Sequence, residues 1–161
     1  MERLKMIESI LSREIAGRPI IAGKDNQRIS HEELAHAYGV SLLCRLLAKK
    51  RNLDEELGAI IGYLHDIGRI RLNILTKDHA SRGAMEAKAI LEDLGIFDPE
   101  EIGIVVSAIE KHDDKERIDN EYDELIKDAD SLERSYHYPN SPRQGLREER
   151  KLKVLAELGI G

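Results

Sequence analysis

Aromatic residues are scarce in this 161-residue chain, which has no Trp, one Phe and five Tyr. Its core must therefore consist mainly of Leu, Ile, Val and Ala. Strands favour β-branched and aromatic residues, whereas Leu and Ala, combined with many Glu, Lys and Arg, favour helices. We therefore predict an all-α fold with almost no sheet, and the chain length fits a single domain over residues 1–161.

Cysteine is nearly absent as well. Cys44 is the single Cys, so no internal disulfide can form, and its place in LLCRLL favours a small buried residue without a chemical role. Residues 1–17 carry charges throughout and lack the long apolar run of a signal peptide or membrane anchor. These absences lead us to expect a cytoplasmic protein that does not enter a membrane.

The chain also lacks an excess of positive charge. Its 25 Lys and Arg are outnumbered by 31 Asp and Glu, and the net charge is -6. Long nucleic acids are held by an excess of Lys and Arg, so no such partner is expected. A small phosphorylated substrate remains compatible with this charge, because a metal ion and a few Arg side chains make a local potential positive.

Apolar periodicity and capping signals divide the chain into helices. Helices are predicted over 2–16, from 30 toward 52, from 54 to about 68, over 78–94, from 98 through 109, over 122–134, and in a charged segment ending at 158. Ser30 and Glu33 have the spacing of a capping box, and residues 98–101 (DPEE) give the clearest helix start. Residues 17–28 and 136–145 are predicted to be loops.

Four of the six histidines fall on the apolar faces of predicted helices. They are His36, His65, His79 and His112, which share a face with Val40, Ile61, Ala87 and Val105, respectively. His31 and His137 do not follow this pattern. One inward histidine is usually a hydrogen-bonded core residue, but four beside inward carboxylates are costly unless something compensates them. A metal ion would do so, because imidazole and carboxylate groups are both good ligands for Zn, Mn, Fe, Co or Ni.

The order of these residues resembles the HD-domain metalloproteins. His36 precedes the pair His65-Asp66 in LDEELGAIIGYLHDIGR, which is similar to the central helix and Gly-basic turn of that family. Asp130 lies in KDADSLER, which is similar to its last motif. The resemblance covers residues 30–135. It implies a compact helical bundle with a metal site at its centre, whose core ligands are His36, His65, Asp66 and Asp130.

Two further segments, HASRGAMEAKAIL and AIEKHDD, also resemble the family. Members with both of these additional histidines usually hold two metal ions. By that resemblance His79 and His112 bind a second ion, and Asp66 bridges the two. One or two divalent ions are therefore the expected cofactors, with Mn, Fe, Co, Ni, Zn and Mg as candidates.

The resemblance implies a phosphohydrolase that acts on a small phosphorylated compound or nucleotide through a metal-activated water. Its candidate catalytic residues are Asp66, Arg69 and Asp113. Arg69 takes the basic position after HDIG, where it either contacts a substrate phosphate or is an ordinary surface residue. Asp113 is either a base or a group beside the ligands. Arg143 and Arg147, around the Pro-containing loop, are weaker candidates for substrate contact.

Other functions are compatible with the same ligands. The chain lacks the Gly-Tyr-Pro segment of the cyclic dinucleotide phosphodiesterase branch, so the bond that is cut, in a monoester or a diester, stays open. Some proteins that resemble HD domains are di-iron oxygenases that use the same six-ligand set. A module that binds metal or nucleotide without catalysis is a third possibility. The sequence leaves the oligomeric state open.

Overall fold

The computed structural model describes residues 1–16, 26–72, 78–137, 139 and 145–160, with only the backbone described for 26–31. These residues form eight helices and no strand, which confirms the all-α prediction. The helices are α1 (Glu2–Ala16), α2 (Asn26–Lys50), α3 (Glu55–Leu64), α4 (Ile67–Leu72), α5 (His79–Leu94), α6 (Pro99–Lys111), α7 (Glu121–His137) and α8 (Leu146–Leu158).

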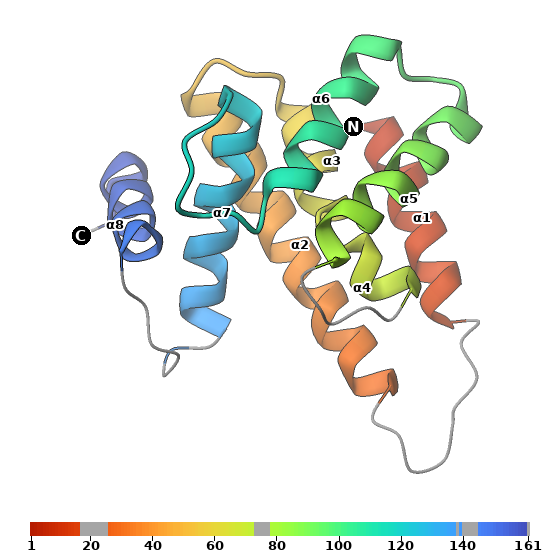
Figure 1. Ribbon diagram of the computed structural model, residues 1–161, viewed down its shortest axis with the longest axis horizontal. Helices are drawn as coiled ribbons and strands as arrows, with labels where there is room; N and C mark the ends of the chain where they lie inside the picture. Colours follow the sequence, from red (N-terminus) through yellow and green to blue (C-terminus); the bar gives the residue numbers. More distant parts are fainter. Residues whose placement is uncertain (17–25, 73–77, 138, 140–144, 161) are drawn as a thin grey trace.

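The helices pack around the long α2, which contacts α1, α3, α4 and α7 (Figure 1). α5 pairs with α6, and α7 also contacts α6 and α8. α1 and α8 lie toward opposite sides of the view in Figure 1. The core between them is mostly aliphatic, as the scarcity of aromatic residues predicted, and it includes Ile60, Ile61, Leu91 and Ile109. None of the described helices combines the length and apolar character needed to span a membrane.

Several helix ends follow the local signals in the sequence. The Asp54 carboxylate caps α3 by accepting a hydrogen bond from the Leu57 N–H at 2.7 Å. Asp98 and Glu101 form the predicted capping box at the start of α6. α5 ends at Gly95, whose φ of 63° lies in the left-handed region that glycine adopts without strain.

The predicted start of α2 and end of α7 are wrong. α2 begins at Asn26 instead of Ser30, because residues 26–29 contain no Gly or Pro that would prevent helix formation. α7 continues to His137, which the sequence analysis placed in a loop. The remainder of the predicted loops lies largely outside the described residues.

The predicted helix ending near Gly68 is two helices. α3 ends at Leu64, His65 and Asp66 form a turn, and α4 begins at Ile67. The His65 Nδ1–H donates to the Gly62 carbonyl at 2.7 Å. That carbonyl is the acceptor that the Asp66 N–H would use in a continuing α-helix. The imidazole therefore competes with the backbone for this acceptor at the point where the helix ends.

α8 is joined to α7 by a cluster of charged side chains around Asp128. This carboxylate accepts hydrogen bonds from Arg51 and Arg150 at 2.8 Å and from Lys153 at 2.9 Å. Burial alone would raise the pKa of Asp128, but the hydrogen bonds from Lys153 and Arg150 lower it. Asp128 is therefore a buried ionic link between α7 and α8.

Gly68 allows α4 to pass close to the start of α5. A Cβ atom at this position would lie 2.3 Å from the backbone oxygen of His79 and 3.1 Å from the Gly83 nitrogen. We expect Gly68→Ala to lower the free energy of unfolding by about 2–3 kcal/mol in a urea titration, because backbone atoms cannot easily move aside.

Gly103→Ala is the matched control, because nothing lies within 4 Å of a Cβ atom at that position of α6. It is expected to be neutral or to stabilise the protein by up to about 1 kcal/mol, since Ala favours helix more than Gly does. Equal stability of the two variants would contradict the close packing of α4 on α5.

Candidate metal centre

Six polar side chains predicted as metal ligands are buried where five parts of the bundle meet. His36 lies on α2, His65 and Asp66 in the turn after α3, His79 at the start of α5, His112 directly after α6, and Asp130 on α7. None is more than 4% exposed. The inward orientation predicted for the four histidines is confirmed.

Four of these residues form the first group. The Nε2 atoms of His36 and His65 are 3.1 Å apart, and Asp66 Oδ2 lies 3.4 Å from the His65 Nε2. Asp130 Oδ1 lies 3.1 Å from the His36 Nε2 and 3.9 Å from the His65 Nε2. Nitrogen and oxygen ligands about 2.0–2.2 Å from one ion are separated by about 3–4 Å. The ligand atoms of His36, His65 and Asp66 lie within 4.8 Å of one another, a spacing that suits a divalent cation, and Asp130 lies beside the two histidines.

A second group shares Asp66 with the first. Its other oxygen, Oδ1, lies 3.3 Å from the His79 Nε2 and 3.4 Å from the His112 Nε2. These two Nε2 atoms are 3.3 Å apart. Each oxygen of Asp66 therefore faces a different pair of histidines, which is the arrangement required of a carboxylate that bridges two ions.

Hydrogen bonds at the far side of three rings fix which nitrogen faces the centre. The Nδ1 atoms of His65 and His112 each lie 2.7 Å from a backbone carbonyl, and the Nδ1 of His36 contacts a carboxylate. The partners are Gly62, Ile109 and Glu133, respectively. Because carbonyls and carboxylates only accept, each Nδ1 carries the hydrogen, and Nε2 is directed to the centre.

The close approach of His36 and His65 suits a cation that both rings share. If both rings are neutral and carry their hydrogen on Nδ1, the two Nε2 atoms, 3.1 Å apart, each present a lone pair and neither can donate a hydrogen bond to the other. Burial lowers the pKa of His36, but its hydrogen bonds to Asp130 and Glu133 raise it to about 9. A divalent ion bound between these nitrogens would supply a positive charge toward which both lone pairs point.

Asp66 and Asp130 are ionised despite their complete burial. Burial alone would raise both pKa values. His65 and His112 lower the pKa of Asp66 well below its usual value, and Lys115 and Arg134 do the same for Asp130. Both carboxylates are therefore charged at neutral pH, the form in which they bind metal.

The other residues singled out from the sequence lie in different places. Arg69 is next to the centre, with its Nε 3.1 Å from Asp66 Oδ1. Asp113 is exposed beside His112, so its catalytic role stays a prediction. Arg147 lies in the first turn of α8, and Arg143 lies outside the described residues. The substrate contacts suggested for these two arginines also stay predictions.

Two cations that were not predicted from the sequence contact the ligands. The Lys115 Nζ is buried and donates to Asp130 Oδ2 at 2.6 Å and to the His112 carbonyl at 2.5 Å. Arg134 donates from Nε to Asp130 Oδ1 and from Nη2 to Asp66 Oδ2, both at 2.9 Å. Arg134 follows Asp130 by four residues on α7, so helical register alone would have placed it on the same face.

Two glutamates beside the predicted ligands were also not predicted from the sequence. Glu133, three residues after Asp130, accepts the hydrogen bond from His36. Glu33, three residues before His36, was interpreted as part of a capping box. The Glu33 Oε2 is buried and has no hydrogen-bond partner among the described residues, and burial and the charge of Asp66 raise the pKa of this carboxyl group. Both glutamates have helical spacing to a predicted ligand, and this spacing was the available signal.

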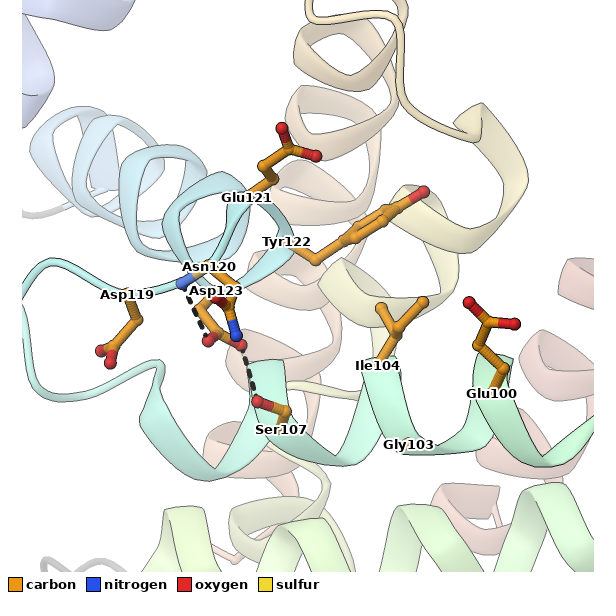
Figure 2. Close-up of a pocket in the computed structure, with 9 residues that line it drawn as sticks. All are labelled: Glu100, Gly103, Ile104, Ser107, Asp119, Asn120, Glu121, Tyr122 and Asp123. Carbon is orange, nitrogen blue, oxygen red and sulfur yellow. Dashed lines mark hydrogen bonds between the residues drawn. The ribbon is translucent and has the colours of Figure 1, made fainter.

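A separate pocket of about 720 Å³ lies between α6 and the start of α7 (Figure 2). Its lining includes the carboxylates of Glu100, Asp119, Glu121 and Asp123, and the described lining residues include no Lys, Arg or His. In Figure 2, Asp123 accepts a hydrogen bond from the Ser107 hydroxyl, 3.0 Å away. The negative lining disfavours anions, so the histidine cluster is the better candidate for phosphate chemistry.

The fold and the buried cluster define an all-helical protein with a candidate centre for divalent metal ions. Residues 34–135, well over half of the chain, match the family model described as HD domain. The chain therefore belongs to the HD domain family. This result confirms the resemblance seen in the sequence.

Curated relatives include Ribonuclease Y of Helicobacter acinonychis (strain Sheeba), which is 30% identical over 145 residues. The match covers 88% of this chain and 25% of that protein. Ribonuclease Y of Helicobacter pylori (strain ATCC 700392 / 26695) is 33% identical over 101 residues, which are 62% of this chain and 17% of that protein. The chain thus spans a quarter or less of the length of these relatives.

A solved structure supports the fold. The crystal structure of a predicted HD superfamily hydrolase from an uncultured Thermotogales bacterium aligns with a TM-score of 0.64 and 24% sequence identity. The alignment covers 99% of this chain and 92% of the other. The two proteins share the same helical architecture.

Proposed function

We propose that the protein is a metal-dependent hydrolase that cleaves a phosphate ester in a small phosphorylated compound or nucleotide. The position of Asp66 carries this proposal, because each of its oxygens faces a separate pair of histidines. The proposed ligands are His36, His65, Asp66 and Asp130 for one ion, and Asp66, His79 and His112 for the other. Membership of the HD domain family supports this assignment.

Divalent ions bound at these positions lower the pKa of a coordinated water and neutralise phosphoryl oxygens. The protein's own residues hold this centre rigidly, since Glu133 orients the His36 ring and Lys115 fixes Asp130. Arg69 supplies positive charge beside Asp66 for a substrate phosphate. Cys44 is fully buried and its pKa is raised by burial, so its thiol does not serve as a nucleophile.

Phosphodiester bonds of RNA are a second candidate substrate. The observation in favour is the similarity to proteins named Ribonuclease Y over most of this chain. One observation favours a small compound: the net charge of -6 provides no general attraction for a long polyanion.

The test combines metal analysis with a substrate panel. Protein purified without chelator is assayed with Mn, Co, Ni, Mg or Zn against nucleoside monophosphates, sugar phosphates, cyclic nucleotides and a short RNA. We expect hydrolysis of at least one small phosphate ester, abolished by EDTA and restored by metal. His65→Ala is expected to reduce kcat/KM by at least about 100-fold, because it removes a ligand of the first group.

Each other outcome points to a different function. Cleavage of RNA alone would favour the second candidate. Iron-dependent oxygen uptake without hydrolysis would favour an oxygenase, and tight nucleotide binding without turnover under every metal would favour a binding module. Either of the last two results would overturn the proposed hydrolase.

A further inference from the structure

Among the described side chains, three cations contact the carboxylates of the metal centre, and they use different oxygens. Lys115 contacts Asp130 Oδ2 at 2.6 Å. Arg134 contacts the other oxygen of Asp130, Oδ1, and also Asp66 Oδ2, both at 2.9 Å. Arg69 contacts Asp66 Oδ1 at 3.1 Å. The two arginines therefore flank Asp66, one at each of its oxygens.

Arg134 contacts the same oxygens that face the first pair of histidines. Asp130 Oδ1 is 3.1 Å from the His36 Nε2, and Asp66 Oδ2 is 3.4 Å from the His65 Nε2. A divalent ion bound by these atoms would lie beside the guanidinium, and the two positive charges would repel each other strongly in a buried site. Arg134 therefore competes with the ion for the same pair of oxygens.

Burial determines which cation can move. The Lys115 side chain is 3% exposed and uses the oxygen of Asp130 that Arg134 leaves free, so it can stay when an ion binds. The Arg134 side chain is 27% exposed, and Arg69 is 19% exposed. Both arginines can therefore turn toward solvent, where a substrate would arrive.

We propose that Arg134 is a movable substrate-binding residue of this centre. Without a bound ion, Arg134 neutralises Asp66 and Asp130. When a divalent ion occupies the first group, Arg134 leaves Asp66 Oδ2 and Asp130 Oδ1 and binds a substrate phosphate. A guanidinium suits this role because its planar donors match two phosphate oxygens. With Arg69 it forms a clamp on the phosphate from both sides of Asp66. The phosphate part of this inference rests on the proposed function.

The test uses Arg134→Gln in the full-length chain and measures binding without turnover. Calorimetric titration is expected to show that Mn²⁺ binds to the first group about tenfold more tightly than in the wild type, because the competing guanidinium of Arg134 is gone. Titration of the Mn²⁺-loaded protein with inorganic phosphate is expected to show about tenfold weaker binding, because one charged donor is missing. A residue with only a structural role would change neither in these directions.

Two further variants sharpen the result. Arg45→Gln makes the same charge change on the exposed side of α2, where Arg45 pairs with Glu55, and it is expected to alter neither affinity. Arg134→Lys keeps the charge without the planar donors, so its phosphate affinity is expected to lie between those of the wild type and Arg134→Gln.

Unchanged or weaker Mn²⁺ binding by Arg134→Gln overturns the proposal, and so does unchanged phosphate binding. Both measurements are independent of hydrolysis. If the expected shifts occur while the wild type hydrolyses no phosphate ester, the role of Arg134 as an anion ligand stands and the proposed function fails.

Discussion

Asp66→Asn is expected to abolish tight binding of both metal ions and to lower kcat by at least about a thousandfold, which corresponds to ~4 kcal/mol. The substitution preserves the shape of the side chain but removes its charge and replaces one oxygen with an amide nitrogen that cannot bind a cation. Because each oxygen of Asp66 faces a different pair of histidines, either amide orientation damages one group directly. Inductively coupled plasma mass spectrometry of dialysed protein measures the metal content, and a steady-state assay measures kcat.

Asp114→Asn is the matched control for this prediction. Asp114 follows His112 by two residues and is exposed, so the same chemical change removes a charge near the centre without removing a ligand. Its metal content and kcat are expected to stay within about twofold of the wild type, as is usual for surface substitutions. An Asp66→Asn protein that retains both ions and most of its activity would contradict the bridging role of Asp66.

Asp130→Ala is expected to destabilise the metal-free protein by about 3–5 kcal/mol, because it leaves the buried Lys115 ammonium without its counter-ion. The Lys115 Nζ would keep only its contact with the His112 carbonyl. Burial already lowers the pKa of Lys115, and the charge of Asp130 opposes this effect. Urea denaturation in the presence of EDTA measures the loss without a contribution from bound metal.

A double variant separates the buried charge from the lost packing. Asp130→Ala combined with Lys115→Met removes both members of the pair, so it is expected to be more stable than Asp130→Ala alone. Two results would contradict this interaction between Asp130 and Lys115. Asp130→Ala would lower the free energy of unfolding by less than about 1 kcal/mol, or Lys115→Met would destabilise the Asp130→Ala protein as much as it destabilises the wild type.

The positions of the histidines could be predicted because a helix places every third or fourth residue on one face. His36, His65, His79 and His112 each share a face with aliphatic residues, and all four are buried. The break between α3 and α4 could not be predicted in this way. It coincides with the hydrogen bond of the His65 ring to the Gly62 carbonyl, and apolar periodicity contains no information on such a bond.

The supporting charges were missed for a different reason. Lys115 lies in the run KHDDKER, which by composition suggests solvated charge, yet it is buried against Asp130. Its burial depends on how the segment after α6 packs against α7, which no local pattern specifies. The positions of Glu133 and Arg134 could have been predicted from helical spacing, because they lie three and four residues after Asp130 on the same helix.

The centre thus combines fixed and movable charges. Glu133 and Lys115 each hold one ligand in place, and they contact atoms other than those that face the ion. Arg69 and Arg134 contact the oxygens that do face the two groups. The first pair is suited to preorganising the ligands, and the second to exchanging one anionic partner for another.

Anomalous diffraction from crystals of the protein soaked in Mn²⁺ tests the central claim most directly. Two peaks are predicted, one among His36, His65, Asp66 and Asp130, and the other among Asp66, His79 and His112. Asp66 would then contribute one oxygen to each ion. The absence of any peak at Asp66, with manganese bound elsewhere or not at all, would contradict the assignment of this cluster as the metal centre.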